Sequence, residues 1–81
     1  MGLVLIRAFV FIVVAPGSER DVYAELRKIS QAVNVDLIYG EFDIVVKVQT
    51  ETLVELKRML CFIRGIDKVH STLTMIVKSS Y

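Results

Sequence analysis

The chain has 81 residues, of which 54% are hydrophobic, and ten Lys and Arg against nine Asp and Glu give a formal charge of +1. This length allows one domain, residues 1–81, which buries only about 60% of the surface that its unfolded form exposes. So much apolar surface in so small a chain predicts assembly with other copies. A single cysteine excludes a disulfide framework, and no cluster of His and Cys offers a structural metal or suggests a cofactor.

The charge distribution argues against direct binding of DNA or RNA, because such binding needs a basic stripe that neutralises several phosphates. The longest basic runs are two pairs, Arg27-Lys28 and Lys57-Arg58. The apolar N-terminal stretch, residues 1–15, is interrupted by Arg7 and has neither a basic start nor a small-residue cleavage site. It is also shorter than the roughly 20 apolar residues of a membrane span. These features predict a soluble cytoplasmic protein.

The first third of the chain predicts a strand followed by a helix. The unbroken apolar run at residues 8–15 ends in a Pro-Gly pair and suits a strand that is buried on both faces. Ser18, with Asp21 three residues later, resembles a helix N-cap. Helical spacing predicts a helix over residues 19–32 whose apolar stripe comprises Val22, Leu26, Ile29 and Val33.

The middle of the chain predicts two strands joined by a turn. Apolar and polar residues alternate over residues 34–39 and again over residues 42–49. Gly40 and Glu41 lie between the two segments, and a glycine there suits a tight turn. Residues 34–49 are therefore expected to form a hairpin.

The last third predicts a helix and a final strand. Thr52 and Glu55 have the spacing of a capping box, and Gly65 suits a helix end. The apolar stripe of this helix is expected to comprise Leu53, Leu56, Leu60 and Ile63. Alternation then predicts a strand over residues 69–78.

The order βαββαβ is that of a ferredoxin-like fold of the α+β class, with a four-stranded antiparallel sheet and both helices on one face. The other face still carries apolar side chains, and we place Ile38, Val45 and Ile76 there. An apolar patch of several hundred Å² rarely stays exposed. We therefore expect two copies to pair through their sheets.

The hairpin turn is the most informative candidate site. Gly40 permits a positive φ, so successive backbone N–H groups of the turn can point at an anion. Asp43 follows and could accept hydrogen bonds from an ammonium group. Donors for a carboxylate beside an acceptor for an ammonium group suit a free amino acid. The alternatives are a plain hairpin with solvated acids, or catalysis by Glu41 and Asp43. Catalysis is less favoured because no nucleophile and base accompany the two carboxylates.

Two other reactive side chains are expected to have ordinary structural roles. His70 lies on the same side of its strand as Thr72 and Thr74, where it suits a surface or an interface, or the lining of a cavity. Cys61 is expected to be a small packed thiol of the second helix.

Three segments in order resemble a known family: AFVFIVVAPGSE, then GEFD followed by IVVKV, and finally RGIDKVHSTLTMIV. They are similar to the effector-binding (RAM) domain of the Lrp/AsnC, or feast/famine, transcription regulators, and the resemblance covers about residues 7–78. It implies sheet-paired dimers that join into rings, commonly tetramers of dimers. It also implies that small effectors, usually amino acids, bind between dimers beside the second hairpin.

The resemblance further implies roles for particular residues. Backbone N–H groups of the hairpin would bind the carboxylate, Asp43 would lie near the ammonium, and apolar residues would select the side chain. The matching positions are Leu37, Tyr39, Gly40, Glu41, Phe42, Asp43, Leu53, Thr74, Met75 and Ile76. The chain differs from the family in having no helix-turn-helix domain before its first strand, and in having Leu73 where members often carry Arg.

The sequence therefore predicts a stand-alone module that senses an amino acid or a related metabolite, without a cofactor and without catalysis. Such a module would influence transcription by assembling with full-length Lrp/AsnC-type regulators. Two alternatives stay open: a small enzyme of the dimeric α/β-barrel type with His70 as a catalytic residue, and a purely structural subunit that forms rings.

Overall fold

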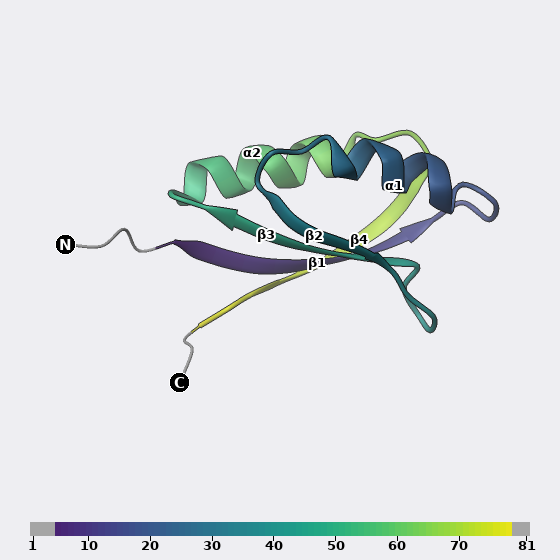
Figure 1. The fold of residues 1–81 in the computed structure, drawn as a ribbon, viewed down its shortest axis with the longest axis horizontal. Helices are drawn as coiled ribbons and strands as arrows, with labels where there is room; N and C mark the ends of the chain where they lie inside the picture. Colours follow the sequence, from purple (N-terminus) through teal and green to yellow (C-terminus); the bar gives the residue numbers. More distant parts are fainter. Residues whose placement is uncertain (1–4, 79–81) are drawn as a thin grey trace.

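The computed structural model describes residues 5–78 of the chain. Its elements follow the predicted order: β1 (Ile6–Val14), α1 (Glu19–Arg27), β2 (Ala32–Leu37), β3 (Ile44–Thr50), α2 (Leu53–Arg64) and β4 (Val69–Ile76). The strands form one antiparallel sheet in the order β2-β3-β1-β4. Both helices lie on the same face of this sheet (Figure 1). The predicted ferredoxin-like fold is confirmed.

The core lies between the sheet and the two helices. The central strands β1 and β3 alternate strictly, because successive side chains of a strand point to opposite faces. Every second residue of each strand is buried under the helices, and each such Val or Ile contributes about 1.5–3 kcal/mol by leaving water. The buried apolar side chains are Ala8, Val10, Ile12, Val14, Val22, Leu26, Val35, Ile44, Val46, Val48, Leu56, Met59 and Ile63.

The first helix is shorter than predicted. It ends at Arg27 instead of residue 32, and Val33, which we placed on its apolar stripe, lies in β2 with 54% of its surface exposed. Pairing of Ala32 with β3 requires extended backbone there, so tertiary contacts override the helical spacing. Ser18 does precede the helix, but its side chain makes no capping hydrogen bond.

The second helix begins as predicted but presents a different stripe. Thr52 Oγ1 accepts a hydrogen bond from the Glu55 N–H at 3.1 Å, which confirms the predicted cap. The buried residues are Leu56, Met59 and Ile63. At about 100° per residue, Leu53 lies about 90° from the centre of this stripe and is 56% exposed.

The same helical geometry overturns the expectation for the thiol. Cys61 lies about 170° from the buried stripe of α2, nearly opposite the core, and it is exposed. It is therefore not a packed core thiol. Neither helix within residues 5–78 is long and apolar enough to cross a membrane.

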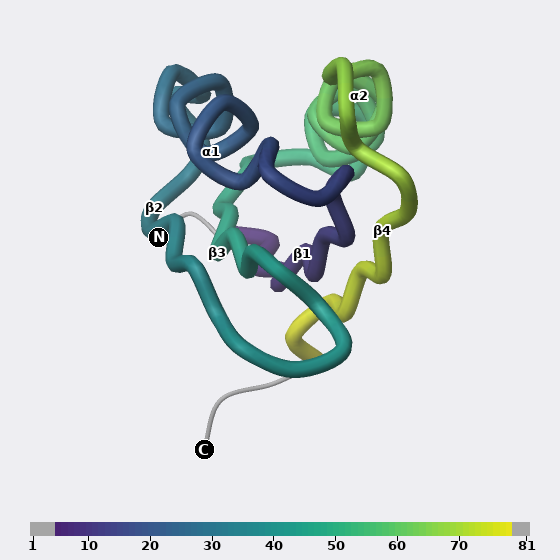
Figure 2. Tube along the Cα trace, turned by 90° about the vertical axis from the view of Figure 1, so that its right-hand side faces the viewer, coloured from purple at the N-terminus to yellow at the C-terminus, as the bar shows by residue number. Residues whose placement is uncertain are grey.

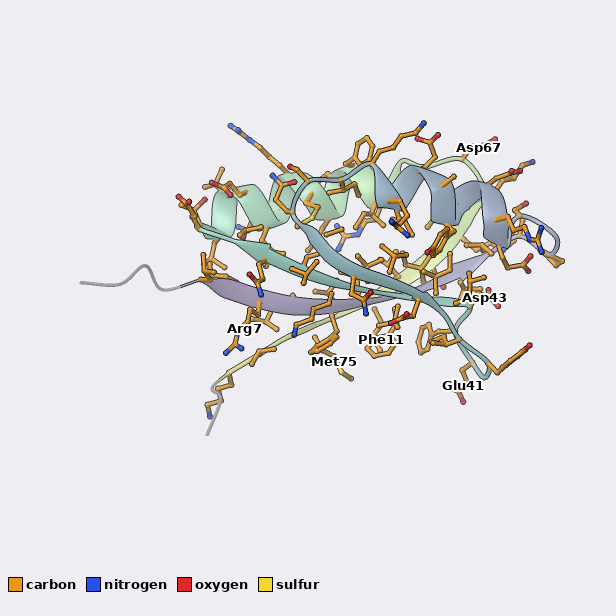
Figure 3. The ribbon with its side chains drawn as sticks, in the orientation of Figure 1. Arg7, Phe11, Glu41, Asp43, Asp67 and Met75 are labelled. Carbon is orange, nitrogen blue, oxygen red and sulfur yellow. The ribbon has the colours of Figure 1, made fainter. Side chains whose placement is uncertain are left out.

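The sheet face away from the helices is rich in large apolar side chains, which we call the open face: Phe9, Phe11, Val45, Leu73 and Met75. Strand register places them together, because Phe9 pairs with Met75, and Phe11 pairs with both Leu73 and Val45. Figure 3 shows Phe11 and Met75 below the sheet, on the side away from the helices. Ile76 was expected on this face but pairs with the buried Ala8. It therefore points to the helix side, because directly paired residues share a face.

Candidate functional site

The connection between β2 and β3, residues 38–43, forms the predicted hairpin and extends below the plane of the sheet, on the side away from the helices (Figure 2). It is closed by a hydrogen bond from the Ile38 N–H to the Asp43 carbonyl at 2.9 Å. Gly40 has a φ of +129°, as the sequence predicted, and a Cβ there would meet no atom within 4 Å. The requirement for glycine is therefore one of backbone conformation and not of space.

The aromatic ring of Phe42 attaches this hairpin to the open face. Its centroid lies 5.4 Å from that of Phe11, with the ring planes at 50°. Pairs of this geometry contribute about 0.5–1.5 kcal/mol beyond their buried area. Tyr39 and Glu41, on either side of Gly40, are exposed. Phe42 is thus an anchor, and its neighbours form the free tip of the hairpin.

Asp43 has a structural contact that the sequence did not reveal. Its Oδ2 atom accepts a hydrogen bond from the Val14 N–H at 2.9 Å. Pairing of β1 with β3 ends at Ile12 and Ile44, so the carboxylate satisfies the N–H group just beyond that pairing. The other carboxylate oxygen makes no hydrogen bond within the part of the chain that the structure describes.

A groove of about 340 Å³ lies beside the hairpin, which we call the hairpin groove. Three of the residues implicated by the family resemblance line it, namely Leu37, Tyr39 and Asp43, and Ile38 and Glu19 complete the lining. This volume lies at the small end of the range for ligand sites, about 300–1,000 Å³. Glu19 was not predicted, because an acid in the first turn of a helix is explained by the helix dipole alone.

The implicated residues outside the hairpin and β2, which are Leu53 and three residues of β4, do not line this groove in one copy of the chain. Leu53 begins α2, which follows the end of β3 opposite to the hairpin. In β4, Thr74 and Ile76 point to the helix side and Met75 points to the open face. Thr74 Oγ1 is buried without a hydrogen-bond partner in the described residues. A single copy therefore does not bring the whole set together.

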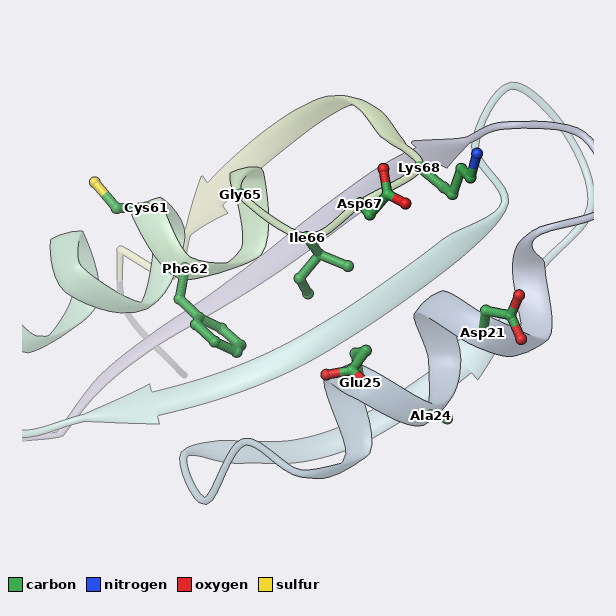
Figure 4. A pocket seen from close by; sticks show the side chains of 9 residues that line it. All are labelled: Asp21, Ala24, Glu25, Cys61, Phe62, Gly65, Ile66, Asp67 and Lys68. Atoms are coloured by element: carbon green, nitrogen blue, oxygen red, sulfur yellow. The ribbon is translucent and has the colours of Figure 1, made fainter.

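A larger groove lies elsewhere, between α1 and α2, with a volume of about 730 Å³ (Figure 4). Asp21, Phe62 and Asp67 are among its lining residues, and none of the implicated residues lines it. We call it the interhelical groove. Volume alone would favour it, but the hairpin groove has the residues that suit an amino acid.

The two isolated reactive side chains, His70 on β4 and Cys61 on α2, are both exposed. Neither lines the hairpin groove. Within residues 5–78, no three His, Cys, Asp or Glu side chains gather as the ligands of a metal ion would.

Comparison with known proteins decides the family. Residues 7–81 match the model of the Lrp/AsnC ligand binding domain. The chain belongs to this family. Two relatives are HTH-type transcriptional regulators named FL11, from Pyrococcus furiosus and Pyrococcus horikoshii, with 38% and 35% identity over 72 and 74 residues. These matches cover 89% and 91% of this chain but 48% and 49% of the relatives, so the chain spans about half their length.

Solved structures agree with the Lrp/AsnC assignment. The hypothetical protein PHS023 from Pyrococcus horikoshii is 34% identical with a TM-score of 0.85, and the match covers 94% of this chain and 93% of that one. FFRP-DM1 is 36% identical with a TM-score of 0.86, over 89% and 97% of the two chains. Escherichia coli AsnC, at 23% identity and a TM-score of 0.88, covers 93% of this chain and 52% of its own, and shows the shared fold. The predicted family is confirmed.

Proposed function

We propose that this chain is a non-enzymatic effector-binding module that binds a free amino acid or a related metabolite in the hairpin groove. The observation that carries the proposal is the grouping of Leu37, Tyr39 and Asp43 around one groove beside Gly40. The match of residues 7–81 to a ligand-binding domain supports it.

The groove suits both ends of an amino acid. The free oxygen of Asp43 accepts from the ammonium group, and charge-assisted hydrogen bonds of this kind are about twice as strong as neutral ones. Backbone N–H groups around Gly40 donate to the carboxylate of the ligand, because the positive φ of Gly40 lets successive amides point the same way. Leu37 and Tyr39, both exposed in the free chain, then cover the apolar part of the ligand.

The proposed module assembles through its open face. Leu73 and Met75 are 43% and 55% exposed, and with Phe9 and Phe11 they form a patch that water would otherwise contact. Pairing two open faces removes this surface from water, and joining such dimers into a ring brings other copies to the hairpin. Leu53, Thr74, Met75 and Ile76 would then contribute from neighbouring copies.

We further propose that binding of the effector to this chain alters transcription, because the chain assembles with longer members of the family. The FL11 relatives are HTH-type regulators, and the region that matches this chain is about half of each. Because the open face is the proposed pairing surface, co-assembly with such a regulator would use the same contact as self-assembly.

Thermal unfolding in the presence of each of the twenty amino acids tests the binding function. A ligand at 100 times its Kd stabilises the folded chain by about 2.7 kcal/mol, which raises the melting temperature by several degrees. We expect such a shift with at least one amino acid. A chain that forms rings without sensing would show none, and that result would reject the proposed function. An enzyme that depends on His70 would lose turnover in a His70→Ala variant, whereas the sensor keeps its shift.

A further inference from the structure

The two helices leave a trough between them, of which the interhelical groove is one end. There, the start of α1 faces the end of α2. A second hollow of about 440 Å³ continues the trough toward the end of α1 and the start of α2, and it shares Glu25 and Phe62 with the first. The two helices are therefore antiparallel, and the trough follows most of their length. We call the two hollows together the helix trough.

The helix trough has apolar side chains along it, and the one in its middle is exposed to water. Phe62, which lines both hollows, is 53% exposed, and its ring points toward α1 (Figure 4). Ile66 lines one end, and Ile29 and Met59 line the other. Aromatic side chains that enter or form such grooves contribute much of the binding energy of interfaces. The helix trough therefore suits a partner with an apolar stripe that covers Phe62.

One end of the helix trough is acidic. Asp21, Glu25 and Asp67 line the interhelical groove with a single cation, that of Lys68. Glu25 forms an ion pair with Lys28 at 3.2 Å, whereas Asp21 and Asp67 form none within residues 5–78. In the second hollow, acidic and basic side chains are equal in number. A partner that complements the whole trough is apolar in its middle and positively charged at the end beside Asp21 and Asp67.

Assembly through the open face leaves the helix trough accessible. Both helices lie on the other face of the sheet (Figure 2). Two copies that pair through their open faces therefore carry their helix troughs on the outer sides of the pair, where each is free for a second contact.

We propose that the helix trough binds a basic amphipathic helix of the longer regulator with which the chain assembles. A third helix fits the shape, because helices pack with the side-chain ridges of one in the grooves of another, and an amphipathic helix buries its apolar stripe in such a groove. Its apolar stripe lies on Phe62, and its cations lie beside Asp21 and Asp67. For the identity of the partner, though not for the chemistry of the site, this inference rests on the proposed function.

A regulator that binds DNA has cations of this kind, because it has to neutralise phosphates. The FL11 relatives are HTH-type regulators, and about half of each lies outside the region that matches this chain. The helix trough and DNA then compete for the same basic helix. Binding in the trough therefore weakens the binding of the regulator to DNA.

Titration of the full chain with two labelled peptides, followed by fluorescence anisotropy, tests the chemistry of the site. Both peptides have about 18 residues, long enough to form a helix, with leucines at helical spacing on one face. The other face carries lysines in one peptide and glutamates in the second. We expect the lysine peptide to bind at least tenfold more tightly than the glutamate peptide. Phe62→Ser should weaken the lysine peptide about tenfold, and Val54→Ser, at a 58% exposed position of α2 outside both hollows, should not.

Two further measurements test the charge and the partner. Asp67→Asn should weaken the lysine peptide several-fold, whereas Asp36→Asn, which removes an exposed acid of β2 outside the trough, should not. Full-length FL11 from Pyrococcus furiosus, titrated with a labelled DNA duplex at low salt, should bind the duplex more weakly when this chain is added in excess. The Phe62→Ser chain should lose this effect, although its open face is unchanged.

Each contrary result has its own meaning. If the glutamate peptide binds as tightly as the lysine peptide, or if Phe62→Ser and Val54→Ser have equal effects, the inference is wrong. If Phe62→Ser changes the sedimentation of the chain, a second copy occupies the trough instead. If the lysine peptide binds but FL11 keeps its affinity for DNA, the partner is wrong. Should Phe62→Ser fail to fold, the comparison of the two peptides and of Asp67→Asn with Asp36→Asn decides. None of these measurements uses an amino acid, so the thermal-shift test of the proposed function succeeds or fails independently.

Discussion

The Asp43 carboxylate accepts a hydrogen bond from the Val14 N–H at 2.9 Å, across 29 residues of sequence. This bond ties the end of β1 to the hairpin at the point where the ladder between β1 and β3 has ended. The same carboxylate lines the hairpin groove. This side chain supports the fold with one oxygen, and in the proposed function its other oxygen binds the ligand, so that the two contributions have to be measured separately.

Two substitutions of Asp43 separate them. Asp43→Ala removes the acceptor of the Val14 N–H and should destabilise the chain by about 1–3 kcal/mol, because a partly buried donor loses its partner. Asp43→Asn retains an acceptor oxygen and should cost less. Both remove the charge and should weaken amino-acid binding more than tenfold. Denaturant unfolding and calorimetry measure the two effects, and undiminished binding by Asp43→Asn would show that the ammonium lies elsewhere.

Substitution of Gly40 tests whether backbone conformation at the turn matters. Gly40→Val places a β-branched residue at a φ of +129° and should cost about 1–3 kcal/mol although its Cβ has free space. The strain should also weaken ligand binding by disturbing the hairpin amides. Gly65→Ala is the control, because Gly65 has a φ of −84° and its Cβ would meet carbonyl oxygens at an ordinary 3.5 Å. Equal melting temperatures for the two variants would contradict this account.

Assembly through the open face is tested with a charge placed on that face, at Leu73 of β4. Sedimentation of the unmodified chain at micromolar concentration should show no stable 9.2 kDa species. Leu73→Glu should produce that species, because pairing would bury an unpaired carboxylate. Phe62→Glu, at a 53% exposed position of α2 beside the interhelical groove, should leave assembly unchanged. A monomeric unmodified chain would refute the pairing.

The exposure of Cys61 makes a chemical prediction. The thiol of the folded chain should react with a water-soluble disulfide reagent as fast as a free thiol in the unfolded chain, within a few-fold. Cys61→Ser should change the free energy of unfolding by no more than about 0.5 kcal/mol, since the side chain lies opposite the core-facing stripe. A thiol that reacts only after unfolding would show that another copy covers this side of α2.

The sequence by itself determined the order of the secondary-structure elements, the start of α2 and the turn at Gly40, because these depend on short-range interactions. The order of strands and helices follows from hydrophobic periodicity, and the start of α2 follows from the contact of Thr52 with Glu55, three residues away. The positive φ of Gly40 follows from the turn between two alternating segments. The family resemblance was visible in the same local segments and was confirmed over residues 7–81. These features depend on contacts between residues only a few positions apart, which the sequence itself places next to one another.

Only the tertiary structure decided where the long-range contacts fall. The pairing of Ala32 with β3 ends the first helix early, and the register of β4 against Ala8 turns Ile76 to the helix side. The bond from Val14 to Asp43 and the presence of Glu19 in the hairpin groove depend on the path of the chain after β1. Strand register and helix placement are set by the packing of the whole core, and a shift of one residue reverses the face of every side chain in a strand.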